Sequence, residues 1–156
     1  MIASVKQVIR IWALVGGVVL VAVVLVNAIS ILASALFNSP FPGDFELTEM
    51  GVGIAAFCFL PYCQLVGANV SADIFTSRIS TRAQYRLELM SHFIALLFAM
   101  LLLWRMSAGL ADYIEYEEIT GVLSIPIWWA FIPALMSLFL LTFSALICLK
   151  ETWIKI

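Results

Sequence analysis

The arrangement of this chain is decided by one polar stretch, Gly67-Ala-Asn-Val-Ser-Ala-Asp-Ile-Phe-Thr-Ser-Arg-Ile-Ser-Thr-Arg-Ala-Gln-Tyr-Arg-Leu-Glu88. It holds Arg78, Arg82 and Arg86, three of the eight basic residues, and long apolar runs lie on both sides of it. Basic loops of membrane proteins stay in the cytoplasm. The stretch is therefore predicted to be a cytoplasmic loop that orients the apolar runs around it.

The same stretch carries a helical pattern. At about 100° per residue, the three arginines share one side of a helix with aromatic and aliphatic residues, and Asp73 lies on the opposite side. This pattern predicts a short amphipathic helix in the membrane interface between spans two and three, with its arginines reaching lipid phosphates. An ordinary cytoplasmic loop, held inside by its charge, is an equal alternative.

Composition places the chain in a membrane. The sequence is 64% hydrophobic and 12% charged, and its mean hydropathy is +1.11. A soluble domain carries about twice that share of charged residues, so too few polar groups exist to cover a soluble globule. A basic surface for nucleic acid is absent as well, and no nucleic-acid partner is expected.

Four apolar runs are long enough to cross a bilayer, which takes about 20 residues. The predicted fold is all-α, a single membrane domain over residues 1–156 with spans at 11–37, 49–67, 87–109 and 126–149. Seven of the eight Lys and Arg residues fall on one side of these spans, and only Arg105 departs. Both termini are therefore predicted to be cytoplasmic.

The start of the last span has its own signals. Ser124 precedes Pro126, and this order predicts a helix that begins here with proline in its first turn. Trp128 and Trp129 follow at the predicted outer end of the span, where they fit the aromatic belt of the membrane interface.

Small and polar residues recur at helical spacing in the first two spans. Asn27, Ser30 and Ser34 form one polar stripe on the first span. Ala13–Gly17 and Gly51–Ala55 are pairs of small residues four apart. These patterns predict close helix–helix packing, either among the four helices or against another membrane protein.

Two ionisable residues are predicted in the outer leaflet. Glu49 opens the second span and Arg105 lies near the end of the third. Because a charge at membrane depth is costly, we expect the two to pair, within the chain or across an interface. The alternative is that Arg105 reaches lipid phosphate.

The sequence shows no nucleophile–base pair, phosphate loop or metal cluster, so no enzyme and no cofactor are predicted. His92 follows Ser91 directly, and adjacent residues on a helix point in different directions. His92 is therefore expected to be a packed histidine, and the three cysteines are expected to act as small hydrophobes. With no charge at the midplane and no matched pair of broken helices, the chain lacks the marks of a self-sufficient transporter. The residues alone indicate a four-span accessory subunit.

Three stretches, in order, resemble one family. Leu47-Thr-Glu-Met50 resembles the glutamate-containing start of the second helix in the small (DctQ-like) membrane subunit of tripartite ATP-independent periplasmic (TRAP) transporters. Gly67 to Asp73 is similar to that family's glycine–x–histidine–hydrophobic–x–x–aspartate turn, although Asn69 stands where the histidine would be. Ser124-Ile-Pro-Ile-Trp-Trp-Ala-Phe-Ile-Pro133 resembles the beginning of its last helix.

The resemblance implies a bacterial inner-membrane, multi-pass subunit that joins a large elevator-type subunit. The large subunit would bind the coupling sodium, and a periplasmic binding protein would deliver a small organic anion such as a carboxylate or sulfonate. No residue of the small subunit would be catalytic. The alternative is a stand-alone four-span assembly or structural protein. Residues expected at protein interfaces or as lipid anchors are Glu49, Arg105, Asp73, Arg78, Arg82, Arg86, Asn27, Gly51, Trp128 and Trp129.

Overall fold

The computed structural model describes residues 2–39, 41–68 and 81–154. Within them lie four helices, α1 (Ile2–Phe37), α2 (Asp44–Val66), α4 (Thr81–Glu115) and α5 (Trp128–Trp153). All four are long and apolar enough to cross a membrane. The predicted all-α, four-span fold is confirmed, whereas the direction in which the chain crosses the membrane stays a prediction. The predicted interfacial helix lies mostly in 69–80, outside the described residues.

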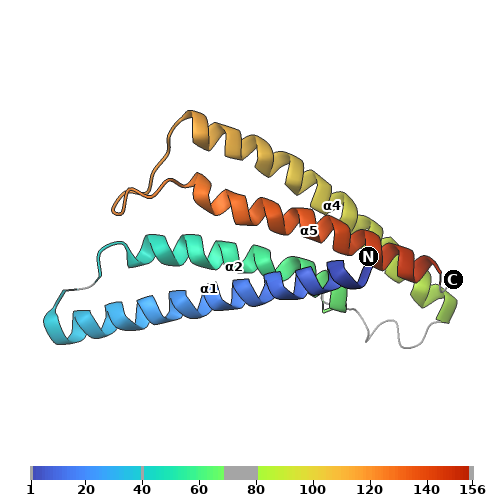
Figure 1. Ribbon diagram of the computed structural model, residues 1–156, viewed down its shortest axis with the longest axis horizontal. Coiled ribbons are helices and arrows are strands. Elements are labelled where there is room, and N and C mark those ends of the chain that lie inside the picture. The colour runs from blue at the N-terminus through green and yellow to red at the C-terminus, as the bar shows by residue number, and fades with distance from the viewer. Residues whose placement is uncertain (1, 40, 69–80, 155–156) are drawn as a thin grey trace.

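The helices form a row in the order α1, α2, α5, α4 (Figure 1). α2 packs against both α1 and α5, α4 packs against α5, and α1 touches α5 only slightly. The start of α1 and the end of α5 lie at the same end of the helices, which we call the terminal end. Residues 38–39, 41–43 and 116–127, which lie between helices, are at the other end, the loop end.

Burial follows the position in the row. In their most apolar segments, 28% of α2 and 39% of α5 is buried, against 11% of α1 and 6% of α4. Ala99, Leu138 and Leu141 form a small apolar core where α4 meets α5. The inner helices α2 and α5 therefore hold the structure together, and the outer helices leave most of their apolar surface uncovered.

Glycines set the close approach of α1 to α2. A Cβ on Gly16 would lie 2.5 Å from Cβ of Cys58, and a Cβ on Gly51 would collide with the side chain of Val23. Gly17 has no such neighbour within 4 Å. The face toward α2 continues from the buried Ala13 to Gly16, and Gly17 lies about 100° further round the helix. The predicted packing at Gly17 is therefore not made among the four described helices, and its packing against another membrane protein stays a prediction. The Gly51–Ala55 face packs within the chain.

Two residues of the polar stripe of α1, Asn27 and Ser30, also face α2. Asn27 Nδ2 donates to the hydroxyl of Thr48 at 2.6 Å and to the Val23 carbonyl at 2.9 Å, and the Ser30 hydroxyl donates to the Asp44 carboxylate. Ser34 is exposed. The predicted helix–helix role is confirmed for Asn27 and Ser30, because their polar groups find partners between the helices and not in lipid.

The last helix begins later than the sequence indicates. Ser124 has a φ of +54°, which is not helical, and α5 begins at Trp128. Residues 118–127 form a short hairpin instead, in which Thr120 N donates to Ile125 O at 2.9 Å and Ile127 N to Glu118 O at 3.1 Å. The predicted role of Ser124 in starting the helix is wrong because these backbone hydrogen bonds hold it in the hairpin. Pro126 lies two residues before α5 begins, next to its first turn, and its carbonyl accepts Trp129 N at 3.2 Å.

Candidate functional site

Glu46 fastens the start of α2 to the hairpin at the loop end. Its two carboxylate oxygens accept the backbone N–H groups of Val122 at 2.6 Å and Leu123 at 2.9 Å. Gly43, with φ +86°, precedes the helix, and a side chain there would collide with Leu123. An acidic residue in a first helical turn is a common pattern, but its partners lie 76 and 77 residues away, so sequence reasoning missed this contact.

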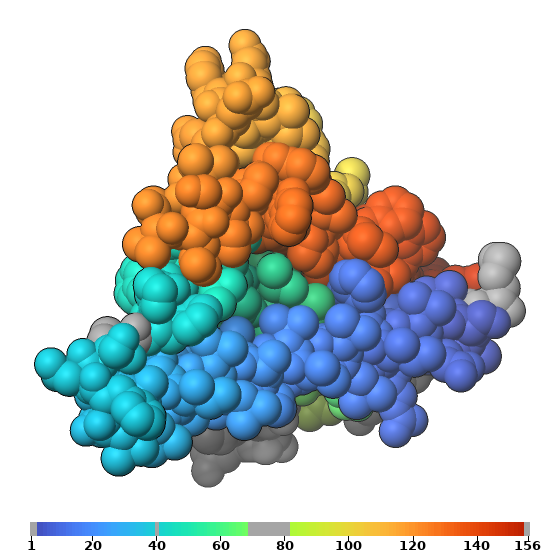
Figure 2. Space-filling view, turned by 60° about the vertical axis from the view of Figure 1, so that its left-hand side comes forward, coloured from blue at the N-terminus to red at the C-terminus, as the bar shows by residue number. Residues whose placement is uncertain are grey.

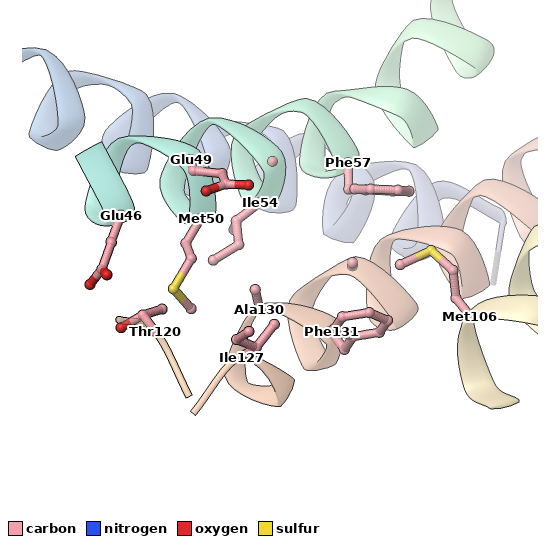
Figure 3. A pocket seen from close by; sticks show the side chains of 12 residues that line it. Glu46, Glu49, Met50, Ile54, Phe57, Met106, Thr120, Ile127, Ala130 and Phe131 are labelled. Atoms are coloured by element: carbon pink, nitrogen blue, oxygen red, sulfur yellow. The ribbon is translucent and has the colours of Figure 1, made fainter. Parts of the chain in front are cut away.

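A groove of about 240 Å³ runs between α2 and α5 beside Glu46 (Figure 3). Glu46, Glu49 and Thr120 lie at one end of it, and Phe57 and Met106 at the other. Its walls are otherwise apolar and come mainly from two helical stripes. Side chains of these stripes include Met50, Ile54, Ile127, Ala130, Phe131 and Ala134.

Glu49 and Arg105 do not pair within the described part of the chain. Both are exposed, and the ion pair between a basic and an acidic side chain among the described residues is Lys6–Glu151, at 2.7 Å. His92 Nε2 lies 3.6 Å from the Glu88 carboxylate. Glu49 lines the groove, whereas Arg105 lies on α4. The predicted ion pair is therefore not formed inside this chain.

A polar cluster joins three helices toward the terminal end. The buried Gln64 of α2 is hydrogen-bonded through Nε2 to Nδ1 of His92 on α4, at 3.0 Å. Its carbonyl accepts the Cys148 thiol of α5 at 3.4 Å, and nearby the Ser144 hydroxyl donates to the Pro61 carbonyl at 2.9 Å. His92 is a packed histidine, as predicted, and sequence reasoning missed Gln64 as its partner.

The remaining predicted residues are spread over the molecule. Arg82 and Arg86 are exposed in the first turns of α4, and Asp73 and Arg78 lie outside the described residues. Trp128 and Trp129 begin α5 with their rings edge to face, 6.2 Å apart, and Trp129 is exposed. The three cysteines are free.

Polar groups in the interior of the membrane spans are satisfied by the protein itself. Trp12 Nε1 donates to Ser137 Oγ at 2.8 Å, and that hydroxyl donates to the Pro133 carbonyl at 2.7 Å. Among the described residues, no buried side-chain nitrogen or oxygen lacks a partner, and no three acidic, His or Cys side chains are grouped to hold a metal. This arrangement is structural.

The largest feature without an internal role is the apolar surface of the outer helices. Figure 2 shows α1 (blue) running uncovered along one face of the molecule. On α4 the exposed side chains include Phe93, Ile94, Leu97, Phe98, Leu101 and Trp104. In a bilayer such surfaces meet either lipid or another membrane protein, so they are candidate assembly surfaces.

A comparison with protein families finds a match over most of the chain. A family described as the DctQ component of tripartite ATP-independent periplasmic transporters matches residues 23–154, a range that includes α2, α4, α5 and the second part of α1. A comparison with curated proteins finds no match.

Proposed function

Since the chain belongs to the DctQ component family of tripartite ATP-independent periplasmic transporters, we propose that it joins a large transport subunit in the bacterial inner membrane. Together they take up a small organic anion, a carboxylate or sulfonate, that a periplasmic binding protein delivers. Sodium drives the uptake and binds to the large subunit. The family match supports the role of a small permease subunit. The identities of the partner, the substrate and the coupling ion are what we propose in addition.

The observation that carries this proposal is the way the chain uses its polar groups at membrane depth. Asn27, Ser30 and Ser137 are hydrogen-bonded to other groups of the protein. A translocation path needs polar side chains or unwound backbone that remain free to bind the substrate and its driving ion. Among the described residues, every buried side-chain nitrogen and oxygen already has a hydrogen-bond partner, which supports an accessory role for this chain.

The assembly surface is inferred to include α4. It is the least buried of the four described helices, at 6% of its apolar segment, and it packs mainly against α5. Arg105 lies on it as an exposed cation without an ion-pair partner among the described residues. A large subunit that covers α4 would bury apolar side chains at close packing and could supply a carboxylate to Arg105.

Co-purification tests this assignment. A tagged copy of this chain should bring the large subunit through mild detergent, and the double variant Phe98→Ala/Leu101→Ala on α4 should bring less of it. The matched variant Val21→Ala/Val24→Ala removes exposed side chains from α1 and should behave like the natural chain. A chain that purifies alone would support the stand-alone assembly protein instead, and an effect confined to the α1 variant would move the interface to α1.

A further inference from the structure

The length and volume of the groove between α2 and α5 fit one acyl chain. Its α2 wall runs from Glu46 to Phe57, which spans about 16 Å along a helix. Its volume is about 240 Å³. One turn of an α-helix with its side chains occupies roughly 500 Å³, so a helix does not fit. An apolar cavity of about 150 Å³ admits benzene, so the groove is large enough for a run of methylene groups.

The direction of the groove favours an acyl chain over an inserted side chain. Residues 46, 49, 50, 53, 54 and 57 of α2 follow the helix repeat, as do residues 130, 131 and 134 of α5 and residue 127 just before it, so both walls run along their helices. Helices that span a bilayer lie roughly along its normal, as acyl chains do. A side chain from a neighbouring protein would enter across the groove and fill only part of its length.

The charge at the polar end selects the headgroup. The carboxylate of Glu46 accepts hydrogen bonds from the backbone N–H groups of Val122 and Leu123, so it is not available to a headgroup. Glu49 lines the groove and has no hydrogen-bond or ion-pair partner among the described residues. It lies near the start of α2, at the same end of the groove as Glu46 and Thr120, where polar groups gather and lipid headgroups are expected. An ammonium group complements this carboxylate, whereas an anionic headgroup is repelled by it.

We propose that the groove between α2 and α5 binds one acyl chain of a phospholipid with a primary-amine headgroup, whose ammonium group contacts Glu49. The lipid fills the space that α2 and α5 leave open at the loop end. The site belongs to this chain alone, so it does not depend on the identity of the partner subunit.

Native mass spectrometry of the full-length chain with equal amounts of phosphatidylethanolamine and phosphatidylglycerol tests the proposal. The natural chain should retain one phosphatidylethanolamine in preference to phosphatidylglycerol. A Cβ on Gly53 meets no atom within 4 Å, so Gly53→Leu should fill the groove and lose the retained lipid. Gly17→Leu, at an equally open glycine on α1, is the control and should keep it. The melting temperatures of both variants show whether they fold.

Replacing the carboxylate tests the headgroup separately. Glu49→Gln should lower the preference for phosphatidylethanolamine about two- to fivefold, as expected for an ion pair near the surface. Glu115→Gln, an exposed carboxylate at the end of α4, should leave it unchanged. Equal lipid retention by Gly53→Leu and Gly17→Leu, or an unchanged preference in Glu49→Gln, would overturn the proposal. So would a photoreactive residue at position 53 that captures a protein chain and no lipid.

Discussion

The two halves of the α2–α5 contact differ in the size of the side chains that meet there. Toward the terminal end the facing residues are small or compact, with Cys58 and Pro61 on α2 and Ser144, Ala145 and Cys148 on α5. Toward the loop end the groove is lined by the larger Met50, Ile54, Phe57, Ile127 and Phe131, with the small Gly53, Ala130 and Ala134 between them. In a bilayer, small residues let helix backbones approach closely and form hydrogen bonds, whereas large ones hold them apart. The same two helices thus form a closed half and an open half.

The largest expected effect comes from adding one bulky side chain to each half. Ser144 is completely buried and bonded to the Pro61 carbonyl, so Ser144→Leu should destabilise the fold by about 3 kcal/mol through overpacking. Gly53→Leu, in the open half, should change the free energy of unfolding by less than about 0.5 kcal/mol. Unfolding in mixed micelles measures both. Equal losses would show that the two halves are packed alike.

A smaller effect is expected from the polar link in the closed half. Gln64 and His92 connect α2 to α4, two helices that otherwise make few contacts. A double-mutant cycle with Gln64→Leu and His92→Leu should give a coupling energy of about 0.6–1.7 kcal/mol, the range for hydrogen bonds between membrane helices. Additive losses would mean that the hydrogen bond does not hold α4 in place.

The smallest effect is expected to be local to the open half. Glu46→Ala removes the acceptor of two backbone N–H groups, so the amides of Val122 and Leu123 should exchange with solvent faster. Global stability should hardly change, because the hairpin lies outside the packed helices. Glu49→Ala is the matched control, one turn further along α2, and should leave both amides unaffected. If the amides of Val122 and Leu123 still exchanged slowly in Glu46→Ala, Glu46 would not be what holds the hairpin to α2.

The sequence predicted those features that depend on composition and period. Four apolar runs gave the helices, and the spacing of Asn27 and Ser30 gave one face of α1. The helical spacing of small residues did not show whether Gly16 or Gly17 faces α2. The two are adjacent glycines, and they differ only in their direction around the helix axis. Glu46 could not be matched to Val122 from sequence, since nothing local marks contacts 76 residues apart. Ser124 carried a helix-start signal that a hairpin overrides.

The central claim is that this chain assists transport and has no translocation path of its own. The most direct test is uptake of radiolabelled organic anion into liposomes with a sodium gradient and the binding protein supplied outside. Liposomes that hold this chain alone should take up no more than empty ones, and adding the large subunit should restore sodium-dependent uptake. Sodium-driven uptake by this chain alone would contradict the account.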